Sequence, residues 1–163
     1  MATLAQDRQF LKAGVSELQD YLSSNELYAT LSGPFTLPRL TLGGLLLARQ
    51  RLGTEADLLA AQIEEIHSKR RAAWDEKVRR EVHARNELWR NYLLDYDESP
   101  KTYRDEYPEQ VRFRAMLVLL GEESNRFDEK LKGIFIPGGF VWEKECAERF
   151  PQDTFWFLFG KLK

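Results

Sequence analysis

Cysteine is nearly absent from the chain: Cys146 is the single one among 163 residues. One thiol excludes an internal disulfide framework and fits a protein of a reducing compartment. The first residues carry no basic segment followed by an apolar one, so no secretory signal is visible. The longest apolar runs, Leu42–Ala48 and Phe155–Phe159, fall far short of the roughly 20 residues that a membrane-spanning helix needs. We therefore expect a cytoplasmic protein without a membrane segment.

The chain also lacks a charge excess and low-complexity segments. Its formal net charge is −2, which excludes a strong overall field towards nucleic acid or anionic lipid. With 43% hydrophobic and 31% charged residues, the composition is that of an ordinary globular protein. A chain of this length can bury roughly 70% of its unfolded surface in one core. We predict a single domain over residues 1–163.

Short catalytic signatures are missing as well. The sequence contains neither a glycine-rich nucleotide loop, nor Gly-x-Ser-x-Gly, nor paired Cys-x-x-Cys. Glu64-x-x-His67 has the spacing of carboxylate-bridged di-iron bundles, but such sites need a second copy of this pair. The other histidine, His83, has Arg80 at the corresponding position. Acidic neighbours should raise the pKa of the Cys146 thiol, which favours a structural cysteine over a nucleophile paired with a histidine. We predict no metal site and no cofactor.

Apolar residues at helical spacing predict the elements of the first third of the chain. One helix is expected behind Thr3, a suitable N-cap, and runs to about Leu22. A short helical turn is expected over Glu26–Leu31. A further helix is predicted over Leu40–Leu52, with Pro38 suited to its first turn. Two glycines inside it cost about 1 kcal/mol each relative to alanine, which the close approach of another backbone would compensate.

The strongest helical pattern runs from Glu55 to about Tyr96, a stretch without glycine or proline. Thr54–Asp57 resembles a capping box at its start. Six apolar residues of the later part fall within an arc of about 80°: Trp74, Val78, Val82, Trp89, Tyr92 and Tyr96. The earlier apolar residues, Leu59, Ile63 and Ile66, lie on an arc rotated from it by roughly 100°. The apolar seam therefore shifts near 67–72, through a kink or a change of packing partner.

The C-terminal part continues the helical pattern. After an acidic connector over 95–109, Pro108 suits the start of another helix, and Ala115–Leu120 is apolar all round, as in a core helix. These elements predict an all-α fold, an irregular multi-helix bundle around one long helix, with a short aromatic-rich C-terminal tail packed on it. Within the single domain, residues 1–98 hold the N-terminal helices and the long helix. Residues 99–163 hold the connector, the buried helix and the tail.

The tail, residues 133–160, contains eight of the twenty aromatic residues. Short helices are expected around 142–149 and 155–159, although the alternation near the end equally suits a strand. The aromatic side chains either cap the bundle as core or form a docking surface for a protein partner or a second copy. The candidate partner-binding residues are Phe155, Trp156, Phe157 and Phe159.

A basic run over 69–90, with interleaved tryptophans, raises the question of nucleic-acid binding. On a helical projection, however, the basic residues surround the helix instead of forming one stripe. The tryptophans share the apolar face. These patterns disfavour a nucleic-acid partner and are typical of a solvated helix surface.

Arg85 stands out because it falls inside the apolar arc, with Arg71 close to the same line. Such an arginine either extends outwards along the surface or is buried with compensating groups. Burial would indicate an ion pair or a polar pocket between helices that holds an anionic ligand. Arg85 and Arg71 are therefore the candidate ligand-binding residues.

The sequence does not fix one function. A non-enzymatic helical interaction or scaffold protein, with a protein partner or self-association, is the leading hypothesis. The alternative is a small-ligand-binding bundle or enzyme with an inter-helix polar pocket around Arg85. A nucleic-acid-associated protein is the third hypothesis.

Overall fold

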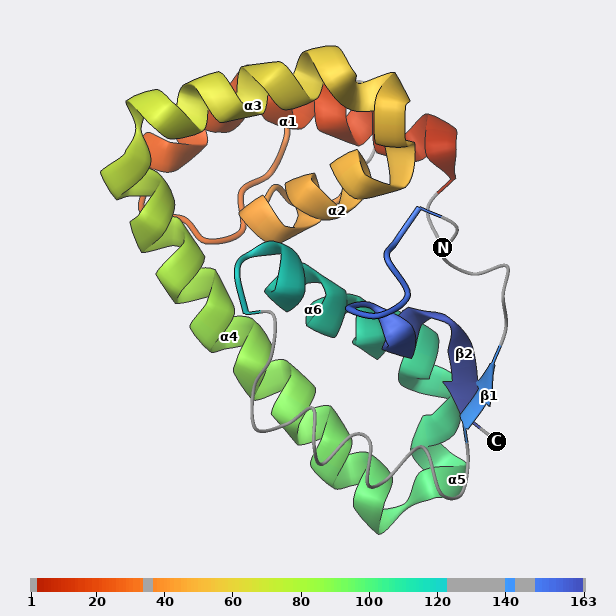
Figure 1. Cartoon of the computed structure of the whole chain (residues 1–163). Coiled ribbons are helices and arrows are strands. Elements are labelled where there is room, and N and C mark those ends of the chain that lie inside the picture. The colour runs from red at the N-terminus through yellow and green to blue at the C-terminus, as the bar shows by residue number, and fades with distance from the viewer. Residues whose placement is uncertain (1–2, 34–36, 123–139, 143–148, 163) are drawn as a thin grey trace. The chain divides into compact units, whose positions relative to one another are not determined.

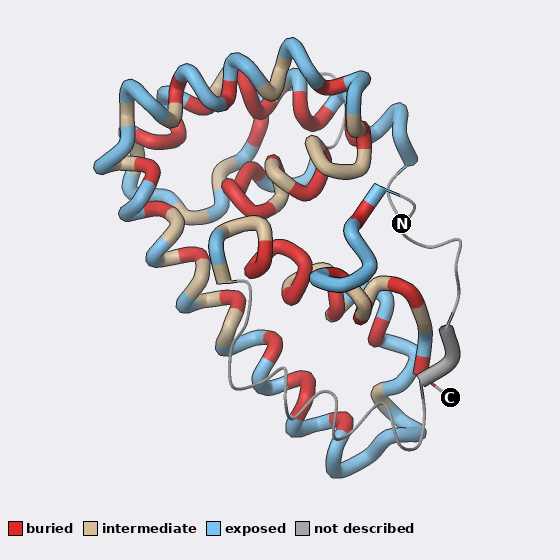
Figure 2. The backbone as a smooth tube through the Cα atoms, in the orientation of Figure 1, coloured by how far each residue is buried: buried red, intermediate tan, exposed pale blue. Residues whose placement is uncertain are grey.

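Helices dominate the computed structural model, which describes residues 3–33, 37–122, 140–142 and 149–162 (Figure 1). The all-α, multi-helix prediction is confirmed. The chain forms two compact units, Met1–Glu81 and Val82–Lys163. The long helix α4 (Arg71–Glu98) runs from the first unit into the second, and its buried positions recur along its length (Figure 2). The prediction that residues 1–163 form a single domain remains a prediction.

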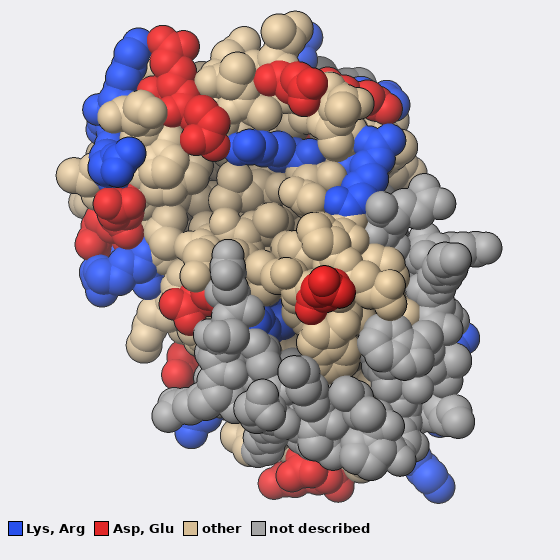
Figure 3. Space-filling view, in the orientation of Figure 1, with Lys and Arg blue, Asp and Glu red and all other residues tan. Residues whose placement is uncertain are grey.

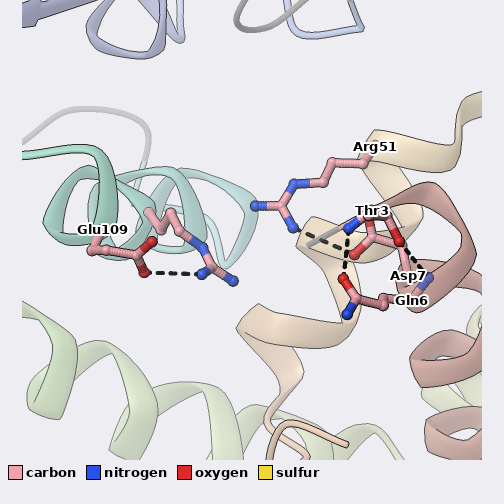
Figure 4. Close-up of polar contacts among 6 residues, drawn as sticks. Thr3, Gln6, Asp7, Arg51 and Glu109 are labelled. Carbon is pink, nitrogen blue, oxygen red and sulfur yellow. Dashed lines mark hydrogen bonds and ion pairs between the residues drawn. The ribbon is translucent and has the colours of Figure 1, made fainter. Parts of the chain in front are cut away.

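Unit 1 begins with α1 (Leu4–Ser23), and Thr3 caps it as predicted. The Thr3 hydroxyl accepts a hydrogen bond from the Gln6 amide at 3.2 Å (Figure 4). The Gln6 side chain in turn accepts one from the Thr3 amide at 2.8 Å. This reciprocal pair satisfies amide groups that a helix start otherwise leaves without acceptors. The apolar face of α1 is buried and consists of Phe10, Leu11, Val15, Leu18 and Leu22.

The chain after α1 is not helical, so the helical turn predicted over 26–31 is wrong. The amide and carbonyl groups of Ala29 pair with those of Leu40 at 3.1 and 2.7 Å in an antiparallel bridge. The Tyr21 hydroxyl donates to the Leu27 carbonyl oxygen at 2.7 Å. These partners from distant positions replace the local hydrogen bonds of a helical turn.

Helix α2 (Leu42–Leu52) begins after Thr41, whose hydroxyl accepts a hydrogen bond from the Gly44 amide at 2.9 Å. Pro38 therefore lies before the helix instead of in its first turn. A Cβ atom at Gly44 would lie 3.0 Å from the Thr41 hydroxyl and 3.5 Å from the Phe10 ring. Side chains, and not another backbone, approach this glycine.

The predicted long helix is interrupted. A 3-10 turn, η1 (Gly53–Ala56), precedes α3 (Asp57–Lys69), and no side chain caps α3. The capping box predicted at Thr54–Asp57 is therefore wrong, because Thr54 lies in the 3-10 turn and α3 begins at Asp57. Arg70 then leaves helical geometry, with φ −122° and ψ 38°, before α4 begins. The break falls inside the window where the sequence predicts that the apolar seam shifts.

Helices α1 and α3 lie side by side in unit 1 (Figure 1). Arg8 pairs with Glu55 at 3.0 Å near the start of both helices. Arg70 donates to the Ser23 hydroxyl at 2.9 Å near the end of both. The two helices therefore run in the same direction.

Unit 2 holds the second half of α4, then α5 (Pro100–Tyr103), η2 (Arg104–Glu106) and α6 (Tyr107–Leu119). The acidic connector is thus largely helical. Helix α6 has Pro108 in its first turn, as predicted, and carries the fully buried Leu117. Gly121 follows with φ +107°, a backbone conformation that favours glycine.

The aromatic-rich tail packs inside unit 2. A 3-10 turn, η4 (Trp156–Leu158), contacts α6, and β2 (Gly160–Leu162) pairs antiparallel with β1 (Phe140–Trp142). The expected helix near the end is thus a single 3-10 turn, and the strand lies after it. Trp142 belongs to a strand, while most of the helix predicted at 142–149 lies outside the described residues.

Candidate functional site

Arg85 is buried in unit 2, with 5% of its surface exposed. Its guanidinium carbon lies 5.5 Å from the centroid of the Phe113 ring, which α6 contributes. A cation over an aromatic face is attracted by the ring's negative face, so Phe113 partly compensates the burial of this charge. The sequence left open whether Arg85 extends along the surface or is buried, and the structure shows that it is buried.

Arg71 does not join Arg85. It is exposed at the first residue of α4 and belongs to unit 1. Fourteen residues along one helix separate the two backbones by about 21 Å. The ligand-binding role predicted for Arg71 therefore gains no support from this arrangement.

Two further polar groups share the helix turn of Arg85. Asn86 is half-buried, and Trp89 has an exposed fraction of 0%. At about 100° per residue, all three residues fall on one side of α4. Neither the Oδ1 atom of Asn86 nor the Nε1 atom of Trp89 has a hydrogen-bond partner within the described parts of the chain, although both atoms are buried. We call Arg85, Asn86 and Trp89 the α4 polar turn.

Tyrosines extend the α4 polar turn along the helix. The Tyr92 ring stacks on Trp89 with centroids 5.6 Å apart, and Tyr96 follows at 6.4 Å from Tyr92. The Tyr92 hydroxyl donates to the Tyr103 carbonyl oxygen at 3.1 Å. Burial raises the pKa of Tyr92 well above its usual value, and Tyr96 and Glu106 raise it further. These phenols are neutral at physiological pH and act as hydrogen-bond donors and apolar surface.

A second arginine is buried in unit 2, and its burial was not predicted from the sequence. Arg114 of α6 has 1% of its surface exposed. It donates to the Glu122 carbonyl oxygen at 3.0 Å and lies 5.4 Å from the centroid of the Phe157 ring. Its signal was the same as that of Arg85: it shares the apolar face of α6 with Val111 and Val118 at helical spacing.

In unit 1, two buried charged residues of α4 form hydrogen bonds with other segments of the unit. Both oxygens of the fully buried Glu81 accept hydrogen bonds from the Gly43 amide, at 3.1 and 2.8 Å. Gly43 lies in the first turn of α2, where free amides and the helix dipole favour a carboxylate. The burial of Glu81 was not predicted from the sequence, because its partner is 38 residues away.

Lys77 is the other buried charge that α4 contributes to unit 1. Its ammonium lies 4.3 Å from the centroid of the Tyr21 ring and donates to Ser24 Oγ and to the Glu26 carbonyl oxygen. Burial lowers the pKa of Lys77, and the charge of Arg80 lowers it further, while Glu26 opposes the change. The segment after α1 is thus held by a cation that lies largely out of water.

Some basic residues of the run over 69–90 also form contacts within unit 1. Arg80 donates to the Asn25 carbonyl oxygen at 2.9 Å, close to the partners of Lys77. Other members pair with acidic neighbours, as Arg79 does with Glu76 at 2.6 Å. On the face shown in Figure 3, Lys and Arg atoms lie beside Asp and Glu atoms. This mixture is typical of a solvated surface.

Glu64 and His67 form contacts with other side chains of unit 1. Glu64 pairs with Arg49 at 2.8 Å, and its other oxygen lies 3.9 Å from His67 Nδ1. The His67 ring stacks on Trp74 with centroids 4.2 Å apart. Among the residues that the structure describes, no group of three His, Cys, Asp or Glu side chains is arranged to hold a metal ion. Cys146 lies outside the described residues.

The predicted partner-binding aromatics are mostly interior. Phe155, Phe157 and Phe159 are buried, with 5%, 1% and 8% of their surfaces exposed, and Trp156 is half-buried. Phe155 packs edge-on against Phe150 at 5.0 Å, and the Tyr107 hydroxyl donates to the Phe157 carbonyl oxygen. To act as a docking surface, these rings would have to leave the interior of unit 2. Their partner-binding role stays a prediction.

Comparison of the chain with protein-family models, with curated proteins and with solved structures finds no match in any of the three. Within the described ranges, none of the helices has the length and apolar character required to cross a bilayer.

Proposed function

We propose that the chain is a helical binding protein whose second unit takes up a small polar molecule at the α4 polar turn. The observation that carries this proposal is a pair of buried polar atoms, Asn86 Oδ1 and Trp89 Nε1, which have no hydrogen-bond partner among the residues that the structure describes and lie on the same side of α4 as the buried Arg85. One atom accepts a hydrogen bond and the other donates one. A bound molecule that offers both functions would satisfy them together.

Energetics support a binding role for this turn. A buried donor or acceptor without a partner costs about 1–3 kcal/mol, and apolar side chains of similar shape would avoid that cost. Native proteins contain few such groups, and those present often belong to functional sites. The α4 polar turn is therefore expected to be less stable than an apolar turn would be, which is typical of residues that recognise a ligand.

Recognition fits the surroundings better than catalysis does. Burial raises the pKa of the neighbouring Tyr92, which makes it a poor base at physiological pH. The interaction or scaffold function predicted from the sequence depended on the tail as a docking surface. The burial of Phe157 in unit 2 favours the ligand-binding proposal over that one.

Replacing Asn86 tests the proposal. In Asn86→Leu an apolar side chain of similar size replaces the unpartnered acceptor, so the ligand-free protein should keep its melting temperature or gain a few degrees. Native mass spectrometry of the freshly purified full-length chain should show a bound small molecule on the wild type and none on the variant. Asn91→Leu is the matched control, since Asn91 is an exposed residue of the same helix.

Trp89→Phe provides a second variant, because it removes the indole donor but keeps an aromatic ring. Trp74→Phe is its control: Trp74 is also buried, but it stacks on His67 in unit 1. The proposal predicts that Trp89→Phe weakens ligand retention and that Trp74→Phe does not. Equal retention by all four variants, or a wild type that carries and binds no small molecule, would refute it.

A further inference from the structure

The hydroxyl of Ser23, at the end of α1, lies beside a cation. Ser23 is exposed, and its Oγ atom accepts a hydrogen bond from the Arg70 guanidinium at 2.9 Å. Two cations of α4 contact the residues that follow. Lys77 donates to the Ser24 hydroxyl at 3.4 Å, and Arg80 donates to the Asn25 carbonyl oxygen at 2.9 Å. Three cations of unit 1 are thus arranged along residues 23–25.

Other exposed serines of unit 1 have different surroundings. The Ser16 hydroxyl donates to the Ala13 carbonyl oxygen at 2.8 Å. The Ser32 hydroxyl donates to a carboxylate oxygen of Glu17 at 3.2 Å. An anionic group attached to either hydroxyl would lie against negative charge, whereas on Ser23 it would lie against a guanidinium.

The sequence around Ser23 suits an enzyme that modifies exposed hydroxyls. Asp20 lies three residues before it and Glu26 three residues after it, and both carboxylates are exposed. A protein kinase with a basic substrate cleft would attract these charges. The chain leaves helical geometry directly after Ser23, so no helix has to unwind on that side of the hydroxyl.

A phosphate on Ser23 would gain more from the cations than it loses at the end of α1. The C-terminal end of a helix disfavours negative charge. Against this, a phosphoserine carries nearly two charges and three acceptor oxygens, which a guanidinium binds through parallel hydrogen bonds. The ammonium of Lys77 and the guanidinium of Arg80 have several donors each, so they can keep their present partners as well. Burial lowers the pKa of Lys77, and an added anion would stabilise its charged form.

We propose that Ser23 is a phosphorylation site whose phosphate is bound by Arg70 in the field of Lys77 and Arg80, which stabilises the contact of residues 24–29 with α4. In the transfer, Ser23 Oγ attacks the γ-phosphorus of a nucleoside triphosphate held by a protein kinase. The new O–P bond replaces the bond between that phosphorus and the β–γ bridging oxygen. A nucleoside diphosphate leaves, and the hydroxyl proton passes to a base of the kinase. The site belongs to unit 1 and does not depend on the α4 polar turn.

Treatment of the folded full-length chain with casein kinase II, a kinase that selects serines near carboxylates, and ATP tests whether Ser23 is modified. Tandem mass spectrometry should locate a phosphate on Ser23, and Ser23→Ala should lack it. Ser16→Ala is the matched control and should keep it, since Ser16 is an exposed serine of the same helix. A chain that carries no phosphate on Ser23 after this treatment would overturn the proposal.

Hydrogen exchange tests whether the cations bind the phosphate. The Ala29 amide donates to the Leu40 carbonyl oxygen and reports the opening of the segment after α1. Its exchange should slow about threefold in the phosphorylated chain, the effect of one or two exposed ion pairs. Arg70→Gln should abolish this slowing, whereas Arg71→Gln, which changes the exposed neighbouring arginine, should preserve it.

Comparison of the modified and unmodified forms of each variant removes the effect of the substitution itself on stability. Exchange at Ala29 that is unchanged or faster after phosphorylation would overturn the proposal, because the end of α1 would then outweigh the cations. A slowing that persists in Arg70→Gln would overturn it as well, since Arg70 would not bind the phosphate.

Discussion

The two units treat buried polar groups differently. In unit 1, Glu81 accepts two hydrogen bonds from α2, and Lys77 holds the segment after α1. In unit 2, Asn86 Oδ1 and Trp89 Nε1 are buried without partners among the described residues. Glu81 and Lys77 thus connect segments of unit 1, while our proposal assigns Asn86 Oδ1 and Trp89 Nε1 of unit 2 to a ligand. We expect unit 1 to contribute stability and unit 2 to contribute recognition.

The largest effects should come from truncating the interior of each unit. Ile63 and Trp89 both have exposed fractions of 0% and belong to different units. Ile63→Ala should lower the free energy of unfolding by about 2–5 kcal/mol and Trp89→Ala by about 3–5 kcal/mol. The double variant, measured by chemical denaturation, should show nearly additive losses, because distant sites without shared partners act independently. Strong non-additivity would contradict the division into two interiors.

Removal of a tail ring should affect unit 2 selectively. Phe157 is 1% exposed and lies under Arg114, so Phe157→Ala should lower the free energy of unfolding by about 3 kcal/mol. Hydrogen exchange should accelerate in α6 and stay unchanged in α1. Unchanged exchange in α6, together with loss of self-association, would instead support the tail as a docking surface.

A cap substitution should affect unit 1 selectively, with a smaller effect. Thr41→Ala removes the hydroxyl that accepts from the Gly44 amide, which should cost about 1 kcal/mol. Thr102→Ala in α5 is the control, since Thr102 is exposed and caps no helix. Hydrogen exchange at the start of α2 reports the effect. A loss no greater than that of the control would show that the cap contributes little.

Alkaline pH should produce the smallest effect, with opposite signs in the two units. The pKa of Lys77 is lowered in the folded chain, so the unfolded chain binds more protons and stability rises with pH until the usual lysine range near 10.5. Burial raises the pKa values of Tyr92 and Tyr107. Their contribution is full below the unfolded pKa near 10 and is lost as pH rises above it.

Hydrogen exchange between pH 8 and 11, corrected for the intrinsic rate, would separate these contributions. Protection should fall first in α6 of unit 2. Tyr92→Phe should flatten that fall and Lys77→Met should flatten the rise in unit 1. A uniform loss of protection in both units would contradict the contrast.

Much of the helical architecture was accessible from the sequence. The Thr3 cap, the buried helix after Pro108 and the shift in the apolar seam near 67–72 follow from spacing over a few residues. The burial of Arg85 was one of two alternatives, and the tertiary structure, which places the Phe113 ring near its guanidinium, decided between them. Arg114 carried the same signal inside an apolar face and could have been found by the same reasoning.

Other features had no local signal. Asn86 is an ordinary polar residue in a charged helix, and nothing near it in the chain indicates that its oxygen is buried. The helical turn predicted at 26–31 failed because Ala29 pairs with Leu40. The capping box at Thr54 failed because a 3-10 turn occupies that position.

The sequence by itself determined most of the longer helical segments, because helix formation depends on periodicity and capping groups within a few residues. The tertiary structure alone decided which polar atoms meet and which are left without partners. Glu81 finds the Gly43 amide across 38 residues, whereas Trp89 Nε1 finds no acceptor among the described residues. The Glu81 carboxylate and Trp89 Nε1 are both buried on α4. A hydrogen bond requires its partner within about 3 Å, so the element that packs over each group decides whether the group is bonded.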